Sequence, residues 1–170
     1  MTRVLPALLA LALAACASAP PPAAVPAGPP QPTPAEIVAA VRAAGQGGLE
    51  LVVIPLVDPH VEDLRDRATA GEQAGRYAQA DAELVKALAI TADNPDLLQW
   101  RAELAVLRGD FAQAEALSAR STVLGPKSGP LCRRNWALKK ALRGLRGESA
   151  NVASAQAMLA ACTIAPPVRM

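Results

Sequence analysis

The chain has 170 residues, of which 52% are apolar and only 2% aromatic; 17 basic residues stand against 15 acidic ones, with one His and three Cys. This length accommodates one small domain plus segments outside it. The apolar residues are mostly Ala and Leu, which favour helices over strands and argue against an all-β fold. A single His and no metal-type Cys spacing leave few candidates for catalysis.

Residues 1–15 predict an export signal. Arg3 precedes an apolar stretch from Val4 to Ala15. Twelve helical residues reach about 18 Å, which is short of a hydrocarbon core of about 30 Å. The stretch therefore has the length of a signal-peptide core and not of a spanning helix.

The end of this leader, LAAC at residues 13–16, resembles the lipobox of bacterial lipoproteins. The resemblance implies cleavage before Cys16, a covalent lipid on Cys16, and anchoring through acyl chains without a transmembrane helix. Ala17 follows instead of Asp, which in Gram-negative lipoproteins implies the outer membrane, facing the periplasm. The alternative is an ordinary secretory signal to which Cys16 is incidental.

Residues 16–34 comprise the predicted lipidated Cys and a tether with eight Pro between Pro20 and Pro34. Because Pro lacks an N–H and fixes φ, this segment is expected to form an extended polyproline spacer of at most about 55 Å. It either holds the domain clear of the lipid surface or serves as a Pro-rich ligand for a partner domain.

Residues 35–57 predict a short helix, ending near Ala44, and then an extended apolar segment over 49–57. Pro55 excludes a central strand there but permits an edge strand. The segment either packs along the helices as a hydrophobic strap or forms a partner-binding strand.

Four helices are predicted to start at a cap or turn residue followed by Pro, which is tolerated at the first helical position. These pairs are Thr33-Pro34, Asp58-Pro59, Asn94-Pro95 and Gly129-Pro130. Thr33 and Glu36 also have the spacing of a capping box.

Residues 58–165 contain an internal repeat. The segment 75–80 (GRYAQA) recurs 34 residues later as 109–114 (GDFAQA), and this period is that of the tetratricopeptide repeat, or TPR. The chain resembles this family at its packing positions too. The matching residues are Leu64, Ala68, Tyr77, Ala80, Leu84 and Ala87, then Leu98, Ala102, Phe111, Ala114 and Pro126.

A third helical pair is expected from Pro130 to about Thr163, turning at Gly147. The resemblance thus implies an all-α, TPR-like solenoid of about three helical hairpins after the signal peptide and linker. Cys132 and Cys162 lie fifteen residues on either side of Gly147. An antiparallel hairpin places them at one level, so an oxidising compartment favours a disulfide. The alternative is two buried, reduced thiols.

Charge is segregated along the chain. Residues 17–126 carry 8 basic and 14 acidic residues, whereas residues 127–170 carry 8 basic residues and Glu148 alone. The basic part is either the solvated face of an amphipathic helix or a surface for an acidic protein or an anionic envelope polymer.

The resemblance also implies a concave groove lined by the first helix of each repeat. The residues placed there by register are Glu62, Arg65, Thr69 and Glu72, then Asp96, Gln99 and Glu103, with Arg133 and Lys140 extending it. Such a groove would orient a partner by charge complementarity.

The predicted function is a non-catalytic protein–protein interaction scaffold, anchored by lipid in the periplasm and involved in envelope, secretion or pilus assembly. No cofactor beyond the lipid, no metal and no nucleic acid partner is expected. The alternative is a structural envelope lipoprotein that contacts peptidoglycan or an anionic polymer through its basic C-terminal helix.

Overall fold

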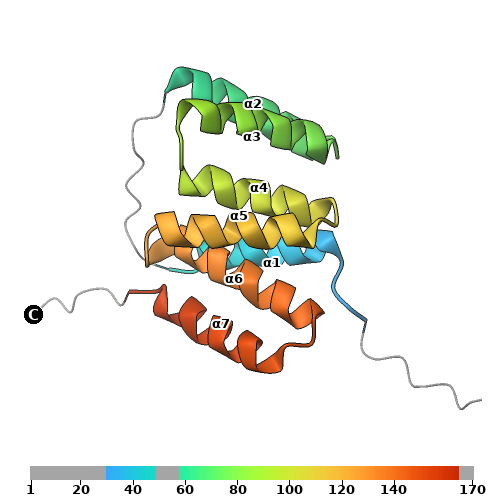
Figure 1. Cartoon of the computed structure of the whole chain (residues 1–170), viewed down its shortest axis with the longest axis vertical. Coiled ribbons are helices and arrows are strands. Elements are labelled where there is room, and N and C mark those ends of the chain that lie inside the picture. The colour runs from blue at the N-terminus through green and yellow to red at the C-terminus, as the bar shows by residue number, and fades with distance from the viewer. Residues whose placement is uncertain (1–29, 49–57, 165–170) are drawn as a thin grey trace, which may run out of the picture. The chain divides into compact units, whose positions relative to one another are not determined.

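The structure is a computed structural model that describes residues 30–48 and 58–164. The predicted signal peptide, Cys16, most of the tether and the segment 49–57 lie outside these residues. Seven helices form the described part (Figure 1), which contains no strand. They are α1 (Pro34–Gln46), α2 (Pro59–Gln73), α3 (Tyr77–Ile90), α4 (Pro95–Leu107), α5 (Phe111–Leu124), α6 (Gly129–Leu145) and α7 (Ser149–Ala161).

The all-α, TPR-like fold class is thereby confirmed. None of the helices in the described ranges has the length and apolar character needed to cross a membrane.

Side-chain caps explain where four of the helices start. Thr33, Asp58 and Asn94 accept hydrogen bonds from backbone N–H groups of the first turns of α1, α2 and α4, and Pro follows each of them. Asp110 accepts from the Gln113 N–H in the first turn of α5. The Thr33–Glu36 capping box is present. The helix predicted to start at Gly129-Pro130 is α6. It starts one residue earlier than predicted, with Ser128 at its N-cap position.

Three antiparallel hairpins, α2–α3, α4–α5 and α6–α7, turn in the same way. Gly75, Gly109 and Gly147 all have φ between +71° and +77°, a conformation that favours glycine. In each turn the next N–H donates to the carbonyl five residues earlier, over 2.8 to 3.1 Å, which is the Schellman closure. The α6–α7 hairpin is therefore built like the other two, and α6 is four residues longer than α4.

Small side chains allow the paired helices to approach closely. Ala68 and Ala80 are fully buried between α2 and α3, and Ala102 and Ala114 are fully buried between α4 and α5. These are repeat positions identified from the sequence. Phe111, which the repeat pattern assigns to packing, is instead 37% exposed.

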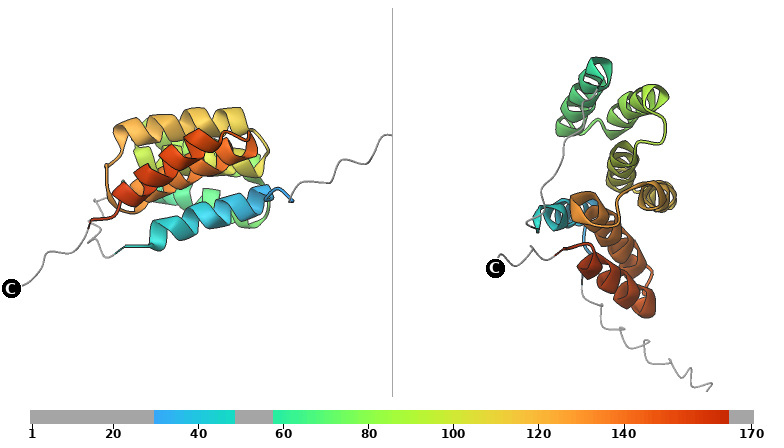
Figure 2. Two further views of the ribbon diagram at one scale, coloured as in Figure 1. Left: turned by 90° about the horizontal axis from the view of Figure 1, so that it is seen from below. Right: turned by 90° about the vertical axis from the view of Figure 1, so that its left-hand side faces the viewer.

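The helix that precedes the repeats packs against the first helices of the later hairpins. Ile37, Val38 and Val41 of α1 join one buried cluster with Leu138 and Leu142 of α6. Both views in Figure 2 place α1 beside α6. A Cβ on Gly45 would lie 2.9 Å from Cγ of Arg134, so the end of α1 approaches the start of α6 closely. The repeat pattern does not predict that α1 packs against α6.

A disulfide and a hydrogen bond join the two ends of the last hairpin, opposite its turn. Cys132 and Cys162 form a disulfide with their Cα atoms 5.6 Å apart. The N–H of Gly129 donates to the carbonyl of Cys162 over 2.7 Å. Equal spacing from Gly147 and antiparallel pairing thus place the two thiols at one level, as the sequence argument requires.

Candidate partner-binding groove

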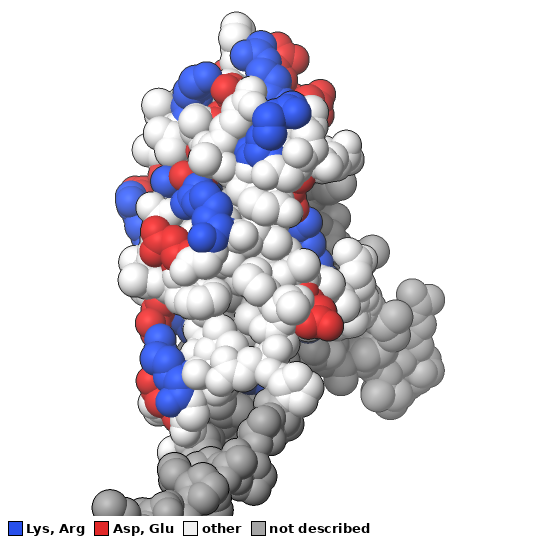
Figure 3. Space-filling model, turned by 90° about the vertical axis from the view of Figure 1, so that its right-hand side faces the viewer, with Lys and Arg blue, Asp and Glu red and all other residues white. Residues whose placement is uncertain are grey.

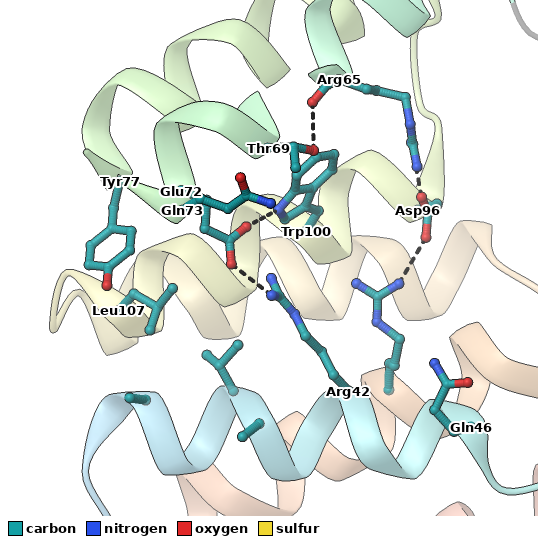
Figure 4. Close-up of a pocket in the computed structure, with 14 residues that line it drawn as sticks. Arg42, Gln46, Arg65, Thr69, Glu72, Gln73, Tyr77, Asp96, Trp100 and Leu107 are labelled. Atoms are coloured by element: carbon teal, nitrogen blue, oxygen red, sulfur yellow. Dashed lines mark hydrogen bonds and ion pairs between the residues drawn. The ribbon is translucent and has the colours of Figure 1, made fainter. Parts of the chain in front are cut away.

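A groove of about 720 Å³ lies between α1, α2 and α4, on the side of the hairpins' first helices (Figure 4). We call it the α1–α2 groove. Its residues are Ala35, Val38, Ala39, Arg42 and Gln46 from α1, Arg65, Thr69, Glu72 and Gln73 from α2, Tyr77, then Asp96, Trp100 and Leu107 from α4, and Arg134 from α6.

Glu103 is the buried anion beneath this groove. Its side chain is fully buried, and both of its oxygens are bonded. Arg42 Nε donates to Oε2 over 2.9 Å, Arg134 donates to Oε1 over 2.8 and 2.9 Å, and Gln99 Nε2 donates to Oε1 over 3.2 Å. A carboxylate this deeply buried is tolerated because it is paired and hydrogen-bonded.

Arg42 also connects Glu103 with α2. Its Nη1 lies 2.7 Å from Oε1 of Glu72, and the other Glu72 oxygen accepts a 2.7 Å hydrogen bond from the Trp100 indole N–H (Figure 4). Burial lowers the pKa of the Arg42 guanidinium, but its hydrogen bonds and charge interactions with Glu72 and Glu103 outweigh this effect and raise the pKa above its usual value. Arg42 is therefore a permanent cation.

Arg134 also connects Glu103 with α2, through Asp96. Its Nη1 donates to Oδ1 of Asp96 over 3.0 Å, while Oδ2 of Asp96 accepts from Arg65 over 3.1 Å. The Arg65 guanidinium carbon lies 5.4 Å from the Trp100 ring centroid, within cation–π range. The contacts close a ring that we call the arginine–carboxylate ring. Its charged members are Arg42, Arg65, Arg134, Glu72, Asp96 and Glu103, three cations and three anions.

The structure brings together four of the predicted groove residues: Arg65, Thr69, Glu72 and Asp96 line the α1–α2 groove. Glu62 is exposed, but it does not line it.

The prediction was wrong for Gln99 and Glu103, because both side chains are fully buried and face no open groove. The reason is that Arg42 of α1 and Arg134 of α6 cover this part of α4.

The prediction was also wrong for the third repeat. Arg133 is only 4% exposed and donates to the carbonyls of Ala44 and Gly45 at the end of α1. Lys140 lines a separate cavity on the other side of α1. Arg133 lies 34 residues after Gln99 and is buried like it. Arg134 lies 34 residues after Trp100 and, like it, lines the groove.

Sequence reasoning missed Arg42, Arg134, Trp100 and Tyr77 as groove residues. Arg42 could not be found from the repeat pattern because it lies outside the repeats. Trp100 lies one residue beyond the predicted Gln99, on the same helix, and no spacing rule distinguished the two.

Two of the basic side chains of α6 and its C-terminal turn pair with acidic residues of the second repeat. Arg134 pairs with Asp96 and Glu103, and Arg146 pairs with Glu115 over 2.8 Å. Basic and acidic side chains lie interspersed on the face shown in Figure 3. Part of the basic charge of α6 is therefore paired with the acidic second repeat.

Among the described residues, no group of three or more His, Cys, Asp or Glu is arranged to hold a metal ion. The α1–α2 groove presents charged, amide, hydroxyl and aromatic groups.

A protein-family model described as a tetratricopeptide repeat matches residues 72–131. No curated protein and no solved structure matches the chain. The matched region runs from the end of α2 to the start of α6. Fold and match together define a protein with TPR-like repeats, a class that typically provides protein–protein interaction scaffolds and not enzymes.

Proposed function

We propose that this protein is a lipid-anchored periplasmic scaffold that holds a protein partner in the α1–α2 groove. The observation that carries the proposal is an open groove whose walls come from helices far apart in the sequence. The ring of ion pairs along it stabilises the positions of those walls. Preorganised walls reduce the ordering cost of binding.

The partner's chemistry follows from the groove's exposed groups. Gln46, Thr69 and Gln73 are exposed polar side chains at its rim, while the partly exposed Leu107 supplies apolar surface. Because the ring balances its own charges, a partner gains little from a net charge of either sign. An extended or helical peptide with polar and aliphatic side chains fits this surface better than a polyion.

The anchor rests on sequence alone. The lipobox-like residues 13–16 and Ala17 support a lipid on Cys16 and the periplasmic face of a bacterial outer membrane. The tether of residues 16–34 then supplies reach from the lipid surface, and envelope, secretion or pilus assembly are the processes that such a placement serves.

A site-specific photo-crosslinker tests the groove in intact cells. Placed at exposed Gln73 in the groove, it should capture a partner, whereas the same group at exposed Ala89 on α3 should not. Adding Thr69→Trp should reduce the Gln73 crosslink at least tenfold by filling the groove, and Ala70→Trp, exposed and outside the groove, should leave it unchanged. Equal capture at Gln73 and Ala89 would reject the groove as the binding site.

The anchor has its own test. Metabolic labelling with a radioactive fatty acid should label the wild type and not Cys16→Ala, and only the wild type should fractionate with outer membranes. An unlabelled wild type contradicts the lipid anchor but leaves the scaffold proposal standing.

A further inference from the structure

A second cavity, of about 450 Å³, lies on another face of α1, between α1, α6 and α7. We call it the α1–α7 groove. Figure 2 shows α1 and α7 flanking α6. Its residues are Gln31, Pro32, Ile37, Ala40, Val41 and Ala44, then Ala137, Lys140, Ala141, Gly144 and Leu145 from α6, and Val152 and Leu159 from α7. None of these residues lines the α1–α2 groove.

The walls are almost entirely aliphatic. Of the lining residues, only Gln31 and Lys140 carry a polar side-chain group, and none is aromatic or acidic. The volume lies within the roughly 300–1,000 Å³ of typical small-ligand pockets, which combine apolar walls with a few polar groups.

Lys140 is the single ionisable group among the described residues of these walls. It is half-buried, and within the described residues it makes no hydrogen bond or ion pair. The neighbouring cations are occupied elsewhere: Lys139 stacks 4.5 Å from the Trp136 ring centroid, and Arg143 donates to the carbonyl of Asn151. An aliphatic groove with one ammonium and no carboxylate complements an apolar ligand that bears one negative charge.

We propose that the α1–α7 groove binds a long-chain fatty acid, with its hydrocarbon chain along the aliphatic walls and its carboxylate at Lys140. Each buried methylene group is expected to raise affinity about fourfold. A partner helix is a poorer occupant, because a helix about 10 Å across fills roughly 850 Å³ over two turns. This inference is independent of the proposed scaffold function.

The binding test uses the full chain with Cys16→Ser, which removes the predicted acylation site. Hexadecanoate, kept below its aggregation concentration, should displace a fluorescent fatty acid saturably, with one molecule bound per chain. Octanoate should bind at least a hundredfold more weakly because it buries fewer methylene groups.

Gly144→Leu tests the position of the site. A Cβ on Gly144 meets nothing within 4 Å, so a side chain can start from this groove position, and Leu favours the helix. Hexadecanoate affinity should fall at least tenfold. Ala153→Leu, on an exposed position of α7 outside the groove, should bind like the parent protein.

Lys140→Gln tests recognition of the carboxylate. It should lower hexadecanoate affinity about tenfold, as loss of a charge-assisted hydrogen bond predicts, and leave hexadecan-1-ol affinity unchanged. Lys139→Gln removes the same charge one residue away and should leave both affinities unchanged.

Four results would overturn the proposal: no saturable binding, binding that Gly144→Leu leaves intact, equal effects of Lys139→Gln and Lys140→Gln, or equal loss of acid and alcohol in Lys140→Gln. Circular dichroism must show parental helix content for each variant. Thr69→Trp fills only the α1–α2 groove and should leave hexadecanoate binding unchanged, so the two proposals fail separately.

Discussion

The first and second hairpins have the same turn and the same small packing residues, yet their inner faces differ. In α2, Arg65, Thr69 and Glu72 line an open groove. In α4, Gln99 and Glu103 are fully buried, because α1 and α6 extend arginines over them. The comparison shows that one repeat unit provides either a binding surface or a core, depending on whether a helix from outside the pattern covers it.

The arginine–carboxylate ring connects the two regions. Glu103 lies in the covered region and Glu72 in the open one, and Arg42 of α1 bonds to both. Breaking the ring at its buried end should therefore affect stability more than changes at exposed pairs. Three perturbations sharpen this comparison.

Reduction of the Cys132–Cys162 disulfide should have the largest effect. The bond closes a loop with a sequence separation of 30, and the chain-entropy model assigns about 3.5 kcal/mol to such a loop. Urea denaturation with and without reductant should show this loss, and Cys132→Ser/Cys162→Ser should reproduce it without reductant. An unchanged midpoint in both cases would contradict a stabilising cross-link in the last hairpin.

Glu103→Ala should lower the free energy of unfolding by about 2–3 kcal/mol, because it leaves the partly exposed Arg42 and Arg134 without their buried partner. The matched control is Glu115→Ala, which removes another glutamate paired with an α6 arginine, but in an exposed pair. That change should cost about 1 kcal/mol or less. Equal losses in urea denaturation would show that burial of the ring does not distinguish the two regions.

Thr33→Ala should have the smallest effect, about 1 kcal/mol, by removing the cap of α1. Hydrogen exchange should accelerate in α1 and leave the α2–α3 hairpin unchanged. Thr69→Ala is the control, since the Thr69 hydroxyl bonds to the Arg65 carbonyl within α2 and caps no helix; its effect should be near zero. Faster exchange in both regions would mean that α1 does not fray independently.

Much of what the sequence predicts correctly depends on features that are local along the chain. The structure contains the glycine turns and the caps at Thr33, Asp58 and Asn94, which depend on neighbours within a few residues. The 34-residue period is a repetition of such local patterns. The pairing of Cys132 with Cys162 followed from counting residues on either side of one turn. Four of the seven predicted groove residues of the first two repeats were placed by the same register.

The rest depended on contacts between distant segments. Only the tertiary structure shows that α1 covers α4 and α6, that Arg42 reaches Glu103 across 61 residues, and that Arg134 lines the groove in place of Arg133. The physical reason is that a helix's own sequence specifies an apolar stripe but not which neighbour will bury it. The repeat register placed Arg133 34 residues after Gln99, but only the packing of α1 against α4 and α6 decided that both side chains are buried.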